Sequence, residues 1–134
     1  KALAGADLAG AILEFIDLTN VDFTGAILNL ANLTGSDLTN ANLTSANVNQ
    51  ANLTDSIFAG ANLENAELDS ADLTNANFTD ANLKTASLLD ANISNTNFSN
   101  AILTGVISSG LTGTPAALPD GWYIDNGVLK ESAP

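Results

Sequence analysis

The chain has 134 residues, 46% of them hydrophobic, which is enough for one domain with a buried core. Its formal net charge is −12, because Lys1, Lys84 and Lys130 are the only bases against 15 acidic side chains. This balance argues against direct binding to nucleic acid or to an anionic membrane, since both require clusters of Lys and Arg. It permits binding to a basic groove on another protein.

The missing residue types narrow the chemistry further. Without Cys there is no disulfide or thiol nucleophile, and without His the chain lacks the commonest metal ligand and general base. We therefore expect no catalytic site, no metal and no cofactor. No apolar run approaches the length of a membrane span. The chain starts at Lys1 and contains no Met, which predicts a processed or trimmed form, by export with cleavage or by truncation.

A five-residue period runs through most of the chain. Every fifth residue from Leu3 to Leu103, 21 positions in all, is large and apolar, and we call these the centres. Two residues before each centre, 15 of 20 positions are Ala, and the exceptions are Ile16, Val21, Ser36, Ser56 and Thr96. The remaining positions are mostly Asn, Asp, Thr, Ser and Gly, so the unit reads Ala-Asn/Asp-Leu-polar-polar.

This period fits neither a helix nor one long strand. Five residues turn an α-helix about 140° beyond one revolution, so the centres would scatter around it. In a strand, an odd period places successive centres on opposite faces. The pattern requires a corner every five residues, with the centre and its Ala inside. Asn, Asp, Ser and Gly suit such corners because they tolerate turn conformations.

The spacing of the aromatic centres predicts how many corners make a coil. Phe58, Phe78 and Phe98 are 20 residues apart, which places them in one column if each coil has four sides. Four of the five exceptions to the Ala rule belong to the same column. The runs at 41–45, 51–55, 61–65 and 71–75 resemble the pentapeptide-repeat family, of cyanobacterial and plastid type. The resemblance implies an all-β fold, a right-handed quadrilateral β-helix of four repeats per coil and about five coils over residues 1–105.

The first coil contains unusually large side chains, and no segment of the sequence predicts a cap at the N-terminal end. Ile12, Phe15, Ile16 and Val21 replace the small or polar residues of later repeats. An open end exposes strand edges that invite pairing. Either a preceding segment has been removed, or two chains meet here as a homodimer.

The outward residues suggest two candidate surfaces. Acidic side chains are densest at Glu64, Glu67, Asp69 and Asp72, where a calcium or acid–base site is conceivable and a solvated surface is preferred. Among the outward apolar residues, we predict that Ile27, Leu30 and Leu89 lie near one side and form a contact patch.

The tail, residues 106–134, leaves the period and predicts a C-terminal cap. Asn126-Gly127 separates two short apolar runs, which is a strong signal for a β-hairpin. Trp122 is expected to cover the open end of the helix. The alternative is that Trp122 and Tyr123 bind a partner.

We expect the function of this chain to depend on surface contacts with another protein rather than on catalysis. We predict a non-enzymatic structural or protein-interaction module with an unidentified protein partner. The resemblance also implies an alternative, a DNA mimic of the quinolone-resistance type that binds DNA gyrase, because the 12 acids and two Lys of residues 1–105 permit it. It further implies the periplasm or thylakoid lumen in preference to the cytoplasm.

Overall fold

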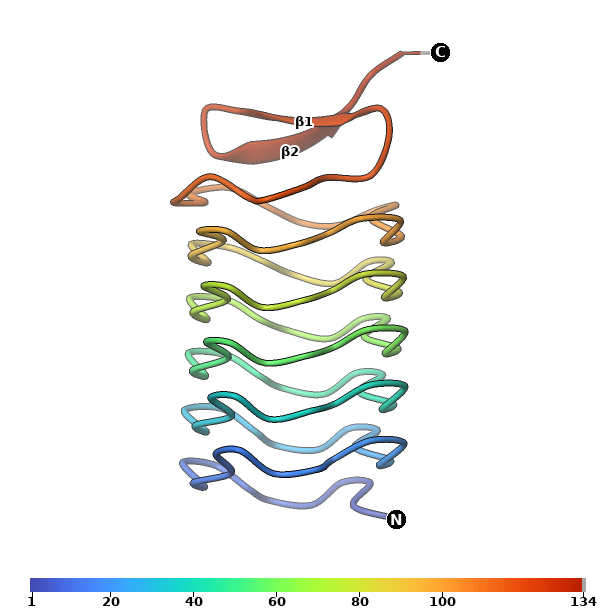
Figure 1. The fold of residues 1–134 in the computed structure, drawn as a ribbon, viewed down its shortest axis with the longest axis vertical. Coiled ribbons are helices and arrows are strands. Elements are labelled where there is room, and N and C mark those ends of the chain that lie inside the picture. The colour runs from blue at the N-terminus through green and yellow to red at the C-terminus, as the bar shows by residue number, and fades with distance from the viewer. Residues whose placement is uncertain (134) are drawn as a thin grey trace.

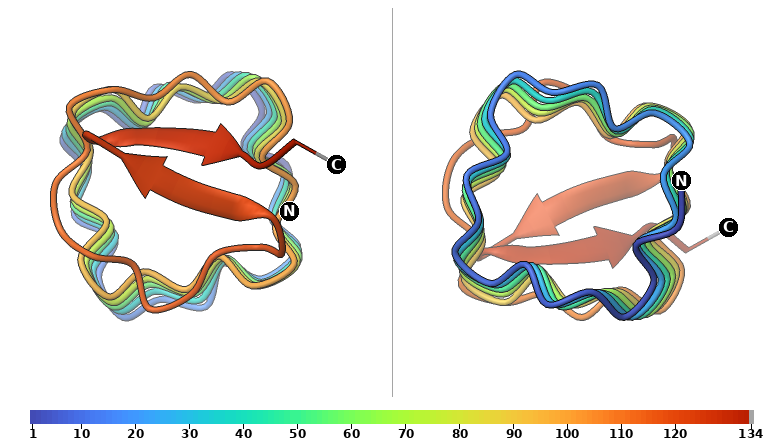
Figure 2. Two further views of the ribbon diagram at one scale, coloured as in Figure 1. Left: turned by 90° about the horizontal axis from the view of Figure 1, so that it is seen from above. Right: turned by 90° about the horizontal axis from the view of Figure 1, so that it is seen from below.

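The computed structural model describes residues 1–133, which form a stack of four-sided coils with a hairpin at the C-terminal end (Figure 1). Single-residue parallel β-bridges join each coil to the next, always between residues 20 apart, from Ala2↔Asp22 to Asn97↔Ala117. Seen along its axis, the stack has a nearly square outline (Figure 2). The sequence period of five and the column spacing of 20 therefore describe one side and one coil.

We number the four sides by their bridging residues and the coils in blocks of 20 residues from residue 1. Side 1 runs from Ala2 to Ile102, side 2 from Asp7 to Ile107, side 3 from Ile12 to Thr112 and side 4 from Asp17 to Ala117. Within residues 1–133, the regular strands are β1 (Trp122–Asp125) and β2 (Val128–Glu131). No helix of this part of the chain is long and apolar enough to cross a membrane.

Each corner is a hydrogen-bonded turn. In the first repeat, the N–H of Ala6 donates to the carbonyl of Leu3 at 3.0 Å, and most later corners repeat this bond. The second residue after each centre has positive φ, as Asn40 does at 59°. Positive φ at only the second central residue is the pattern of a type II turn, which favours Gly and Asn there.

The Asn or Asp before each centre has a local role. Its Oδ1 accepts the N–H two residues later, as from Thr44 to Asn42 at 3.0 Å, and frequently the Thr hydroxyl as well, here at 2.6 Å. This Asx-type contact fixes the approach to the corner. It explains why Thr follows Asn or Asp at a spacing of two in eight of the 21 repeats.

The core is a single column of side chains inside the coils. The centres of coils 2 to 5 are fully buried, and so are the Ala residues beside them. The ring centroids of Phe58 and Phe78 are 4.8 Å apart and those of Phe78 and Phe98 are 5.6 Å apart, both pairs stacked. The predicted aromatic column on side 4 is confirmed.

Hydrogen bonds explain three of the four exceptions to the Ala rule on side 4. Ser36, Ser56 and Thr96 are buried, and their hydroxyls donate to the carbonyls of Leu13, Leu53 and Leu73. The Thr96 bond is 2.7 Å long. A buried hydroxyl is tolerated only when bonded, so these inward polar residues tie side 4 to the corner that follows side 3.

The parallel ladder continues past residue 105, the expected end of the repeats, to Ala117. The bridges at Ile107, Thr112 and Ala117 keep the spacing of five although the Ala-Asn/Asp-Leu pattern has ended. Bridges use backbone atoms alone, so they persist after the side-chain pattern stops. Each side thereby carries six stacked bridging residues, a sixth level beyond the five coils expected.

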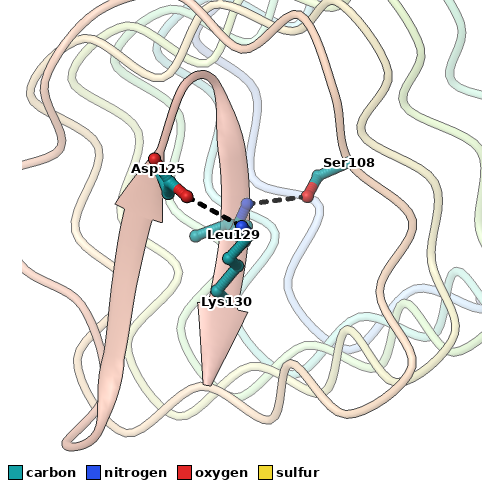
Figure 3. Close-up of polar contacts among 4 residues, drawn as sticks. All are labelled: Ser108, Asp125, Leu129 and Lys130. Atoms are coloured by element: carbon teal, nitrogen blue, oxygen red, sulfur yellow. Dashed lines mark hydrogen bonds and ion pairs between the residues drawn. The ribbon is translucent and has the colours of Figure 1, made fainter. Parts of the chain in front are cut away.

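The hairpin of β1 and β2 lies across the last coil (Figures 1 and 2). Its strands pair antiparallel around Asn126-Gly127, where the sequence predicts a hairpin. The Leu129 N–H donates to the Ser108 hydroxyl at 2.9 Å, and Lys130 pairs with Asp125 at 2.7 Å (Figure 3). Leu129 is buried with the core cluster. Ser108 and Gly113 stand at centre positions of the period, where the repeats have large apolar residues.

Candidate interaction surface

The four acidic candidates follow one another around coil 4 and do not converge. Glu64 lies on side 1, Glu67 and Asp69 on side 2, and Asp72 on side 3. Most of them bond within the solenoid: the amide of Asn49 donates to Glu67 at 3.0 Å, and the N–H of Thr74 donates to Asp72 at 3.0 Å. Within residues 1–133, no three acidic side chains are grouped to hold a metal ion.

The remaining acids are also dispersed between columns. Asp17 and Asp37 bridge to each other on side 4 and are the one pair of acidic residues stacked in neighbouring coils of the repeats. Every other acid of the repeats has non-acidic residues 20 positions before and after it. The negative charge is therefore spread over all four sides and forms no continuous stripe.

Local hydrogen bonds hold two of these acids in the charged form. The hydroxyl and the N–H of Thr19 donate to Asp17, and those of Thr24 donate to Asp22, so the pKa of each carboxyl is lowered from 3.8. Bonds to the charged form favour ionisation. The stabilisation is complete above the ordinary pKa and is lost as the pH falls through the lower, folded value.

Replacing both acids with Asn should reduce the sensitivity of the fold to acid. The amide oxygen of Asn keeps the acceptor, as it does in Asn42, but does not titrate. Relative to the wild type, the Asp17→Asn/Asp22→Asn variant should therefore gain thermal stability between pH 4 and pH 2. Thermal unfolding across this range tests the prediction, with Asp55→Asn as control because Asp55 has no local Thr donor. Parallel curves for the double variant and the wild type would contradict it.

The predicted apolar patch divides into two parts. Ile27 and Leu30 lie in coil 2 on side 2 and at its corner with side 3, and both are exposed. Leu89 is half-buried in coil 5 of the same side, and Asn49 and Asp69 occupy its position in the two coils between. Leu89 is therefore separate from Ile27 and Leu30.

A different set of residues joins Leu30 in the structure. Ile12 bridges to Asn32 on side 3, with Leu30 at one corner of this side and Phe15 at the other. Their exposed fractions are 75% for Ile12, 73% for Phe15 and 59% for Leu30. We call these three residues the side 3 surface. The sequence shows the bulk of the first coil, but the grouping with Leu30 appears only when coils are stacked.

Phe15 and Leu30 adopt a backbone conformation that does not suit them. Of the 21 corner residues, the other 19 are Gly, Asn, Asp, Ser, Thr or Gln. Phe15 and Leu30 nonetheless have φ of 55° and 62°. A left-handed conformation costs an ordinary residue roughly 1–2 kcal/mol, more than it costs Gly or Asn. The ring of Phe15 lies over Gly35, where a Cβ would overlap it.

The comparisons identify the family. The sequence model described as pentapeptide repeats, in eight copies, matches residues 3–40, 36–75 and 66–105. This chain belongs to the pentapeptide-repeat family. The match agrees with the resemblance of the sequence and implies the right-handed quadrilateral β-helix of the family. No curated protein matches the chain.

Two solved structures share the fold. The pentapeptide-repeat protein Rfr23 from the cyanobacterium Cyanothece 51142 is 28% identical, with a TM-score of 0.81 over 84% of this chain and 91% of Rfr23. A trypsin-treated form of QnrB1, a plasmid-mediated fluoroquinolone resistance protein, is 21% identical, with a TM-score of 0.73 over 82% of this chain and 59% of QnrB1. At this identity, the likeness to QnrB1 shows the fold alone.

The aromatic residues of the hairpin differ in exposure. Trp122 and Ile124 are half-buried and pack against the core of this pentapeptide-repeat protein, whereas Tyr123 between them is exposed. The alternation follows from the strand, in which successive side chains point to opposite faces. Trp122 thus lies over the last coil with the more deeply buried Leu129, a residue that the sequence did not single out. Tyr123 is the one of the two predicted aromatic residues that is accessible.

Proposed function

We propose that this pentapeptide-repeat protein is a non-enzymatic interaction module that binds a cationic protein through the side 3 surface. The observation that carries the proposal is the exposure of Phe15 and Leu30 in a left-handed conformation. Residues held in unfavourable backbone conformations cluster at functional sites, because stability alone would replace them. Large apolar side chains exposed at corners stabilise the solenoid little, since their contact with the core is small.

The surroundings of the side 3 surface favour a partner with positive charge. Glu14 lies between Ile12 and Phe15, and Asp17 and Asp37 follow on side 4. The molecule as a whole carries a net charge of −12. Apolar anchors within an acidic field match a partner that offers an apolar pocket rimmed by Lys or Arg.

The hydroxyl groups of the repeats support a role without catalysis. Those of Thr34 and Thr74 donate to the side chains of Asn32 and Asp72. A nucleophilic hydroxyl requires a base that removes its proton, and the carboxamide oxygen of Asn32 is no such base. The Asp72 oxygen accepts both the hydroxyl and the N–H of Thr74, the same pair of turn contacts that Asn32 makes with Thr34. These contacts serve the turns of the solenoid.

Replacing Phe15 and Leu30 with Asn should separate binding from stability. Asn and Gly are the commonest corner residues of this chain, and Asn tolerates positive φ. Thermal stability should therefore stay unchanged or rise by a few degrees, since about 1 kcal/mol corresponds to roughly 4–8 °C in a small domain. Affinity for the partner should fall at least tenfold, measured with the purified partner after cross-linking through a photoreactive group at residue 12.

Ile57→Asn is the matched control, because Ile57 is an exposed apolar residue on side 4 away from the side 3 surface. It should bind as the wild type does. A large drop in the thermal midpoint of the Phe15→Asn/Leu30→Asn variant would show that both residues are structural. Undiminished binding by a stable double variant would overturn the proposal.

A further inference from the structure

A groove lies beside the hairpin at the C-terminal end of the stack. The strands β1 and β2 cross the last coil obliquely and leave part of its square outline uncovered (Figure 2). A cavity of about 480 Å³ is lined by residues 113–118 of the last coil and residues 122–124 of β1, and we call it the cap groove. Its volume is within the range of ligand sites, about 300–1,000 Å³. Its lining is mainly apolar and includes Pro115, Leu118, Trp122 and Ile124.

The wall of the cap groove that β1 forms has unpaired backbone groups. The N–H of Ser132 donates to the carbonyl of Gly121 at 2.7 Å, and hydrogen-bonded pairs of an antiparallel ladder recur at every second residue. Tyr123 and Asp125 therefore bond to β2, and Ile124 between them directs its N–H and C=O away from β2. Among residues 1–133, these two groups of Ile124 have no partner outside the hairpin.

The opposite wall has unpaired backbone groups as well. Each centre of side 4 donates its N–H to the next coil, as Phe98 does to Ala117 at 2.9 Å. Leu118 holds this position in the last coil, and within residues 1–133 its N–H has no backbone partner. The same is true of the Ala116 carbonyl, whereas the equivalent carbonyl of Thr96 accepts from Ala116 at 2.8 Å. The cap groove is therefore an apolar channel with free backbone groups on both walls.

We propose that the cap groove binds an extended segment of another protein, in which apolar residues alternate with Lys or Arg. An extended chain offers N–H and C=O groups along both of its edges, so it pairs with Ile124 on one side and with the last coil on the other. A small apolar ligand satisfies neither wall. Successive side chains of the segment point to opposite faces, so its apolar residues contact Leu118 and Trp122 while the others face solvent.

The charge around the cap groove selects a basic segment. Residues 106–134 contain Asp120, Asp125 and Glu131 against Lys130, which already pairs with Asp125. The residues that line the groove include no base, so Lys or Arg of the segment meets an acidic rim without repulsion. The groove lies at the other end of the stack from the side 3 surface (Figure 1). This inference goes beyond the proposed function, and the two can fail independently.

A short peptide of this chemistry tests the site. The probe is the heptapeptide Lys-Val-Lys-Val-Lys-Val-Lys with both ends blocked. Trp122 is the only Trp of the chain and lines the groove, so its fluorescence reports occupancy. Titration should give a saturable change with a dissociation constant below about 100 μM. The same peptide with Glu in place of Lys should bind at least tenfold more weakly, and the Phe15→Asn/Leu30→Asn variant should bind the Lys peptide as the wild type does.

Proline at residue 124 tests the backbone pairing. Ile124→Pro removes an N–H that does not bond to β2, and an edge strand tolerates Pro on its free side. Ile124→Ala is the matched control, because it also shortens the side chain but keeps the N–H. The Lys peptide should bind Ile124→Pro at least tenfold more weakly than Ile124→Ala.

Several outcomes would overturn the inference. No saturable signal, or equal affinity for the Lys and Glu peptides, would reject a basic occupant. Equal affinity of Ile124→Pro and Ile124→Ala would reject pairing with β1. If Ile124→Pro fails to fold, a Lys peptide with N-methylated Val residues decides on the wild type: it should bind at least tenfold more weakly, and undiminished binding would leave only side-chain contact. Protection of the Ile124 amide that rises with protein concentration, without peptide, would assign the groove to a second copy.

Discussion

Replacing Phe78 with Ala is expected to lower the free energy of unfolding by about 3–5 kcal/mol, the usual cost of removing a buried aromatic side chain. Phe78 is fully buried, and its ring lies between those of Phe58 and Phe98 at 4.8 and 5.6 Å. The backbone ladder fixes the separation of the coils, so the neighbouring rings cannot close the cavity. Urea unfolding followed by circular dichroism measures the loss.

Phe78→Leu is the matched control for this prediction. Leu occupies the same column at Leu38, so its shape suits the interior of side 4. Its cost should stay near 1–1.5 kcal/mol, and the difference from Ala reports the cavity. A loss below 1 kcal/mol for Phe78→Ala would contradict close packing of the aromatic column.

The repeats were predictable because one physical demand recurs in every five residues. A corner that buries a centre and its Ala forces the same apolar spacing on each side, and the recurrence of Phe58, Phe78 and Phe98 gave the number of sides. The hydroxyl hydrogen bonds of Ser36 and Thr96 could not be predicted from the sequence, since their acceptors are backbone carbonyls of residues 23 positions earlier. The continuation of the parallel β-bridge ladder from residue 105 to Ala117 could not be predicted either, because backbone pairing needs no side-chain pattern.

The candidate surface was only partly predictable for a related reason. Residues close in sequence, such as Glu64 and Asp72, lie on different sides because each repeat turns a corner. Residues stacked in space are instead 20 positions apart, as Ile12 and Asn32 are. Comparing residues 20 positions apart identifies stacked pairs but not neighbours that lie diagonally across a corner. The sequence shows that Phe15 and Leu30 are exceptional corner residues, but only the backbone φ angles show that their conformation is strained.

The second large effect concerns the small residue beside each centre. Ala71→Leu is expected to destabilise the fold by about 1–3 kcal/mol, because a well-packed core has no room for added carbon atoms. Ala71 is 1% exposed and stacks between Ala51 and Ala91, which are equally buried. Its carbonyl accepts from Asn92 at 3.0 Å, and its neighbour Asp72 donates to Ala51 at 3.0 Å. The backbone on both sides is thereby tied to adjacent coils and cannot move outward to admit a larger side chain.

Ala59→Leu makes the same chemical change at a half-buried position that follows a centre. Its side chain points away from the core, so its effect should stay within about 0.5 kcal/mol. Denaturant unfolding of both variants isolates the packing cost from any change in local propensity. Equal stability of Ala71→Leu and the wild type would mean that the interior has spare volume beside Leu73. The Ala of each repeat would then reflect the demands of the corner rather than those of the core.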